Sequence, residues 1–278
     1  MKRQKPKLLV ISAAAFSQGN WNLTDEVYLR KWIDNMPMSQ NKLDTVKTIP
    51  KNINKDDEKV KDNISDTLYF PLEKYHGNWK DPEAVYTSFV TRAYMRLSGG
   101  GYLKGFYSKT GITGGRDNLA NIGQPTKEAY VLTDECRAYL KELLSYCNKL
   151  GIEHVLLLQP PHETQAADKS GLEQIESITK AYGYDFLDLS TDYESIAGID
   201  DSHDFADFEH LNAYGAQKLS SYIGDMAVNQ YGIKSDTAKS ELSRWKKSVK
   251  RTKKALKMAR EYTDRGEAQV VGEYEAAK

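Results

Sequence analysis

Residues 207–218 read DFEHLNAYGAQK, and the rest of the chain is organised around this run. Asp207 stands three residues before His210, so its carboxylate can hold one imidazole nitrogen and leave the other free to take a proton. Apolar residues then recur at helical spacing over 211–226, with Asn212 as the expected N-cap. The pattern predicts half of a catalytic triad on a short loop fixed by a packed helix. The alternative is a solvated acidic loop in which His210 caps a helix.

Composition bounds the class of protein. The chain has 278 residues, of which 40% are hydrophobic and 28% charged, enough for one large α/β domain or two small ones. Lys plus Arg and Asp plus Glu both number 39, so the total charge predicts no acidic partner. Cys136 and Cys147 share one face of a predicted helix, about 16 Å apart along its axis, too far for a disulfide. No apolar run reaches the length of a membrane span.

The order of predicted elements indicates a parallel sheet. Residues 7–12 form an aliphatic run that predicts a buried strand, although the basic residues before it also resemble a short signal peptide. Later, a helix over 133–151, a strand over 154–158, a helix over 172–182 and a strand over 184–188 lead to the Asp–His segment. This alternation is the tail of a doubly wound sheet, whose ligands bind at the carboxyl ends of the strands.

Two segments carry a resemblance to a known family. Residues 204–226, DFADFEHLNAYGAQKLSSYIGDM, resemble the last block of the SGNH/GDSL hydrolase superfamily, in which a D-x-x-H pair precedes the final helix. The H-L-N-x-x-G-A-x-K pattern and the segment FPLEKYHGNW resemble the branch related to membrane-associated acyltransferases that esterify cell-wall and exopolysaccharides. The resemblance implies Asp207 as orienting acid, His210 as base, His76 as a substrate-cleft residue and Asn20 as an oxyanion donor.

The family's nucleophile is the feature that this sequence lacks. In the superfamily it is a serine in a G-D-S block after the first strand, upstream of the K-P strand, and this chain begins at that K-P strand. The resemblance therefore covers most of residues 5–232 and implies a three-layer, flavodoxin-like α/β sheet without its first strand. Ser12, at the end of the K-P strand, could be proposed as a substitute nucleophile, but it lies on a different strand from the one that precedes the family's serine. We expect the chain by itself to be inactive, and to self-associate or partly unfold because residues 8–11 would lack their neighbouring strand.

Three parts are expected along the chain. Residues 1–234 form the truncated SGNH-like domain, with a helical or irregular insertion over about 25–130, broken by Pro37 and Pro50. Residues 235–278 form a basic amphipathic tail. Its Trp245 stripe either docks on the domain below a solvated lysine face, or the helix docks on anionic lipid or polymer. Residues 266–278 are expected to be frayed.

The function predicted is an ester hydrolase or O-acyltransferase acting on carbohydrate-linked acyl groups. Its partners would be an acylated polymer and a membrane acyl-transfer protein, and its location extracytoplasmic, with an anchor upstream of Met1. No cofactor or nucleic acid is implied, and the acidic loop at 200–210 matches no metal-binding signature. The alternative is a non-catalytic polysaccharide-binding module that uses the aromatic residues Tyr75, Trp79 and Tyr102.

Overall fold

The structure is a computed structural model that describes residues 5–17, 30, 33–34, 36–52, 68–69, 80–83, 85–86, 89–90, 103, 105–234 and 239–272. The chain divides into two compact units. Asn20–Tyr94 form the smaller one, and Met1–Gly19 with Met95–Lys278 form the larger one, which contains the Asp–His segment.

Short strands and longer helices alternate through the larger unit. Its described strands are β1 (Leu8–Ser12), β2 (Ser108–Lys109), β3 (Lys127–Ala129), β4 (His154–Gln159), β5 (Gln165–Asp168), β6 (Asp185–Asp188), β7 (Phe205–Asp207), β8 (His210–Leu211) and β9 (Val270–Val271). Its described helices are α1 (Ala14–Ser17), α7 (Arg116–Asn121), α8 (Asp134–Leu150), α9 (Ser170–Ala181), α10 (Tyr193–Ala197), α11 (Ala213–Asn229) and α12 (Lys239–Asp264).

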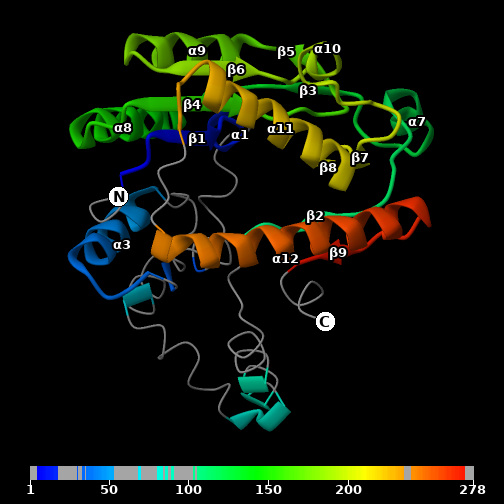
Figure 1. The fold of residues 1–278 in the computed structure, drawn as a ribbon. Helices are drawn as coiled ribbons and strands as arrows, with labels where there is room; N and C mark the ends of the chain where they lie inside the picture. The colour runs from blue at the N-terminus through cyan, green and yellow to red at the C-terminus, as the bar shows by residue number, and fades with distance from the viewer. Residues whose placement is uncertain are drawn as a thin grey trace. The chain divides into compact units, whose positions relative to one another are not determined.

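The central sheet has the strand order β1-β4-β6, and all its pairings are parallel. Residues of β4 alternate between two cores. Val155 and Leu157 pack with α8 and α9 on one face, while Leu158 packs with α10 and α11 on the other (Figure 1). The predicted mixed α/β class with a parallel sheet is therefore confirmed, and helices cover both faces of the sheet, as expected for parallel strands.

Local signals explain where α8 begins and ends. The Thr133 side chain accepts a hydrogen bond from the backbone N–H of Cys136 at the first turn, and Gly151 ends the helix in the left-handed conformation. Cys136 and Cys147 are both buried and free, which confirms that they form no disulfide with each other. Burial raises the pKa of both thiols, so these cysteines behave as core residues.

The C-terminal segment packs onto the larger unit. Ala255 and Ala259 of α12 are fully buried and share a core with Ala213 at the start of α11 and with Val271. β9 pairs antiparallel with β2, so the prediction of a frayed end is wrong for residues 266–272. Two valines cannot mark a strand by periodicity, and the pairing depends on a partner about 160 residues earlier in the chain.

The smaller unit is described mainly around α3 (Gln40–Asn52). The helix runs two residues past Pro50, so the predicted break at this proline is wrong. A proline in the last turn removes one backbone hydrogen bond there but leaves the earlier turns intact. Val46 and Leu68 are fully buried in this unit.

Candidate functional site

Asp207 and His210 lie on the two strands of a tight hairpin and not on an open loop. β7 and β8 pair antiparallel, with Asp207 opposite His210. The Asp207 carboxylate spans the turn, since its Oδ1 accepts hydrogen bonds from the backbone N–H groups of Glu209 at 3.0 Å and of His210 at 2.9 Å. Aspartate favours turns through such contacts. The same side chain therefore shapes the turn and contacts the histidine.

Asn212 fixes the hairpin to the helix that follows. Its Oδ1 accepts a hydrogen bond from the backbone N–H of Tyr214 at 2.9 Å, which confirms the predicted N-cap of α11. Its Nδ2 donates to the backbone carbonyls of Gly111 at 3.1 Å and His203 at 2.6 Å. Because this side chain is fully buried and bonded at both ends, it anchors the backbone two residues after His210.

The two side chains are placed as a catalytic base and its orienting acid require. His210 Nδ1 lies 2.7 Å from Asp207 Oδ1, and the side chains are 40% and 39% exposed. A neutral imidazole that donates its Nδ1–H to the carboxylate keeps Nε2 unprotonated. His210 can therefore accept a proton at Nε2, while Asp207 stabilises the imidazolium that forms.

A lysine that the sequence did not indicate joins the pair. Lys109 Nζ lies 3.0 Å from Asp207 Oδ2 and 3.1 Å from His210 Nδ1. Lys109 occupies β2, which pairs with β9, and it also forms a parallel bridge with Asn212. No motif surrounds Lys109, so only these long-range pairings bring its ammonium to the site.

The contacts of Asp207 keep it ionised. Partial burial opposes ionisation, but hydrogen bonds from His210, Lys109 and the backbone N–H of Glu209 outweigh it and hold the pKa of Asp207 below its usual range. Asp207 is therefore a carboxylate at neutral pH, which is the form that can orient a histidine.

His210 lines a small hollow next to the end of β4. The hollow has a volume of about 270 Å³, and its lining residues are Tyr107, Lys109, Pro160, Pro161, Glu209, His210, Leu211 and Leu219. The two prolines directly follow β4, so His210 lies at the carboxyl end of that strand, as the sheet pattern predicted. Within the described residues this lining contains no serine or cysteine, and Ser12, at the end of β1, is not part of it.

A buried carboxyl group lies behind the hairpin. Glu163 is fully buried, and its backbone N–H donates to the carbonyl of Phe208 at 3.2 Å. Burial, helped by the nearby carboxylates of Asp201 and Asp207, raises the pKa of Glu163 to about 7, although contacts with Thr113 and the backbone of Gly115 oppose the shift. The Arg116 guanidinium donates to the Glu163 backbone carbonyl at 2.8 Å rather than to its carboxylate.

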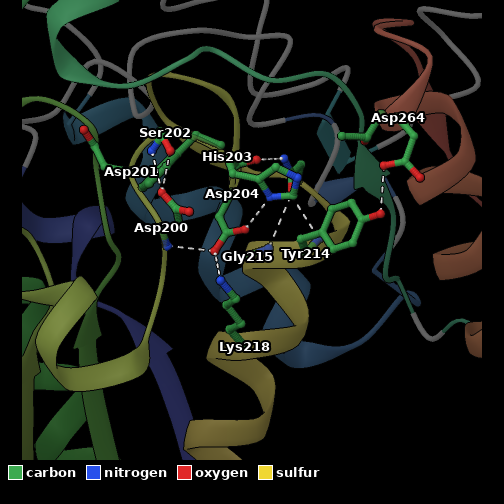
Figure 2. Close-up of polar contacts among 12 residues, drawn as sticks. Asp200, Asp201, Ser202, His203, Asp204, Tyr214, Gly215, Lys218 and Asp264 are labelled. Carbon is green, nitrogen blue, oxygen red and sulfur yellow. Dashed lines mark hydrogen bonds and ion pairs between the residues drawn. The ribbon is translucent and has the colours of Figure 1, made fainter.

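The acidic loop before the hairpin is internally bonded. The Asp204 carboxylate lies 3.0 Å from the His203 ring, 2.8 Å from the backbone N–H of Asp200 and 2.6 Å from the Lys218 ammonium. Figure 2 shows it among these three groups. Asp204 is fully buried. Its ion pair with Lys218 joins the loop to α11. Among the residues that the structure describes, no group of three His, Cys, Asp or Glu side chains is arranged to hold a metal ion.

The remaining site predictions lie outside the described residues. They concern Asn20, His76 and the aromatic residues Tyr75, Trp79 and Tyr102. A larger hollow of about 520 Å³ lies between α10, α11 and α12, but neither Asp207 nor His210 lines it.

Comparison with known proteins gives no assignment, because no family model, curated protein or solved structure matches this chain. In the described part of the chain, no helix has the length and apolar character needed to cross a membrane. The fold and the site thus define a parallel α/β protein with an Asp–His pair at the carboxyl end of its central strand.

Proposed function

We propose that Asp207 and His210 are the acid–base half of an SGNH-type ester hydrolase or O-acyltransferase that acts on carbohydrate-linked acyl groups. The observation that carries the proposal is the 2.7 Å contact between His210 Nδ1 and Asp207 Oδ1 beside a hollow at the end of β4. The carbohydrate substrate, the extracytoplasmic location and a membrane acyl-transfer partner are supported by the sequence resemblance.

The proposed reaction uses His210 twice. A serine hydroxyl attacks the acyl carbonyl while Nε2 of His210 takes its proton, and backbone amides stabilise the oxyanion. The carbohydrate alcohol then leaves with that proton as the acyl–serine bond is completed. Water or an acceptor hydroxyl then attacks the acyl–enzyme and loses its proton to His210, which passes that proton to the serine oxygen as the acyl–serine bond breaks. Water gives hydrolysis, and an acceptor hydroxyl gives acyl transfer.

The serine is the residue that the proposal still requires. The resemblance places it before the strand formed by β1, so the test uses the chain extended upstream of Met1 in its reading frame. We expect a serine-reactive fluorophosphonate to label this protein, and Asp207→Asn to slow labelling by orders of magnitude because the wrong tautomer is held. Asp225→Asn, an exposed change on α11, is the matched control.

The same experiment separates the rival function. A non-catalytic polysaccharide-binding module would show no labelling that depends on His210, yet would still bind polymer. Near-normal labelling of Asp207→Asn would remove this residue from the triad. Labelling lost in His210→Ala and kept in Asp225→Asn would support the esterase class, and transfer to an added carbohydrate would then distinguish transferase from hydrolase.

A further inference from the structure

An exposed apolar stripe runs along the first half of α12. Leu242, Trp245 and Val249 are 42%, 48% and 49% exposed, and their spacing of three and four residues puts them on one side of the helix. The packing face is different, since Ser248 and Ala255 are 6% and 0% exposed. These three side chains, which the sequence suggested would dock on the domain, are therefore nearly half exposed to solvent.

A row of lysines lies directly beside this stripe. Lys246, Lys250, Lys253 and Lys257 are all exposed and follow one another at steps of four, three and four residues, so they form a continuous line along the helix. Over residues 242–260 the sequence contains no Asp or Glu. In the described part of α12, Lys257 of this row forms an ion pair with the carboxylate of Glu261, at 3.8 Å.

We propose that the first half of α12 docks on an anionic lipid surface, with Leu242, Trp245 and Val249 in the interface and the lysine row at the headgroups. Charge complementarity and the neighbouring apolar stripe carry the inference. Amphipathic helices with aromatic and aliphatic residues beside lysines bind membranes in this orientation, because both burial and electrostatic attraction contribute. Tryptophan suits the interface, since its ring is apolar while its N–H stays hydrated.

Lipid accounts for the surface better than a soluble polyanion does. A polymer of phosphates would contact the lysines alone and leave three large apolar side chains in water. The buried side of α12 supports the same orientation, because Ala255 and Ala259 hold the second half against the larger unit and keep the stripe facing outward. The first half of α12 is thus held in place by the packing of its second half on the larger unit.

The test measures binding of the whole chain to vesicles by co-sedimentation. We expect binding to phosphatidylcholine mixed with phosphatidylglycerol, little binding to phosphatidylcholine alone, and a steep decrease with added salt. Tryptophan emission should shift to shorter wavelength on binding, and the shift should be lost in Trp245→Phe. Equal binding to both kinds of vesicle would overturn the proposal.

Two pairs of substitutions test the electrostatic and the apolar parts of the proposed lipid contact separately. Lys246→Glu with Lys253→Glu should weaken binding to the anionic vesicles at least about tenfold. Leu242→Ser with Val249→Ser should weaken it about tenfold through lost burial. The control pair is Lys127→Glu with Lys141→Glu, which changes the net charge equally on exposed residues outside α12 and should bind as the wild type.

Each departure from these results counts against lipid docking. If the serine pair binds vesicles like the wild type, the contact is purely electrostatic and an anionic polymer is the better ligand. If the control pair weakens binding as much as the α12 pair, general charge rather than this surface is responsible. Unchanged thermal unfolding of all variants, expected for exposed positions, excludes misfolding as the cause.

Discussion

The ammonium nitrogen of Lys109 lies 3.1 Å from Nδ1 of His210. The same Nδ1 lies 2.7 Å from Asp207 Oδ1. One ring nitrogen cannot donate to the carboxylate and also accept from the ammonium, so the tautomer of His210 decides which contact is a hydrogen bond. A proton on Nδ1 makes Nε2 the base. A proton on Nε2 would instead leave Nδ1 as the basic nitrogen, and Nδ1 would then be occupied by the hydrogen bond from Lys109.

The first prediction is that neutral His210 carries its proton on Nδ1. The carboxylate contact is the shorter one, and the ammonium can donate to Asp207 Oδ2 at 3.0 Å without using the ring. Nitrogen chemical shifts of the imidazole report the tautomer directly. Asp207→Asn should reduce the Nδ1–H population, and Lys109→Met should preserve it. A proton found mainly on Nε2 in the wild type would show that Lys109 masks the base.

The second prediction concerns stability against pH. Because burial raises the pKa of Glu163 from 4.5 to about 7, its protonated form stabilises the fold fully below pH 4.5, and this contribution is lost as pH rises through about 7. Relative to Glu163→Gln, which keeps the shape without ionising, the wild type should lose about 3 kcal/mol of unfolding free energy over that range. Urea unfolding at several pH values measures the difference. A constant difference would mean that Glu163 does not titrate there.

The third prediction tests the ion pair under the acidic loop. Asp204→Ala should lower the free energy of unfolding by about 3 kcal/mol, because it leaves the backbone N–H of Asp200 and the Lys218 ammonium without their buried acceptor. Asp225→Ala, an exposed change on the same helix as Lys218, should stay within about 0.5 kcal/mol of the wild type. Equal effects in chemical denaturation would contradict the assigned burial of Asp204.

The fourth prediction uses two glycines of α11. A Cβ on Gly215 would lie 2.5 Å from the backbone carbonyl oxygen of Asp204, whereas a Cβ on Gly224 would meet nothing within 4 Å. Gly215→Ala should therefore destabilise by about 1–3 kcal/mol, and Gly224→Ala should stabilise by about 0.5–1 kcal/mol through helix propensity. Thermal unfolding compares them. Similar shifts for both would argue against the close approach of the loop to α11.

The elements that could be predicted carry their signals locally. Thr133 and Gly151 mark the ends of α8, Pro160 follows the end of β4, and Asn212 caps α11. The pairing of Asp207 with His210 was equally accessible, because three residues separate them and a turn brings them together. Each of these signals depends on neighbours within a few residues, and so a single sequence contains it.

The rest depends on contacts between distant residues. Lys109 reaches the site through strands of two residues, which are too short to show any alternation. The orientation of α12 was also hidden, because its packing face contains Ser248 and Ala255 while Trp245 and Val249 stay outside. Small residues pack closely without a strong apolar pattern. In the first half of α12 the larger apolar side chains therefore indicated the wrong face, whereas Leu256 and Ala259 in the second half pack on the domain as predicted.

The pairing of β2 with β9 also has a consequence for the order in which the protein assembles. Thr110, next to Lys109, accepts a hydrogen bond from the backbone N–H of Gln269 at 2.7 Å, across 159 positions of the chain. During synthesis the chain emerges from its N-terminus, so the hairpin of Asp207 and His210 can form well before this contact exists. The bridge from Lys109 to Asn212 can form with the hairpin, whereas the pairing of β2 with β9 needs Val271. The support that β9 gives to the strand of Lys109 is therefore added after the Asp207–His210 hairpin has been synthesised.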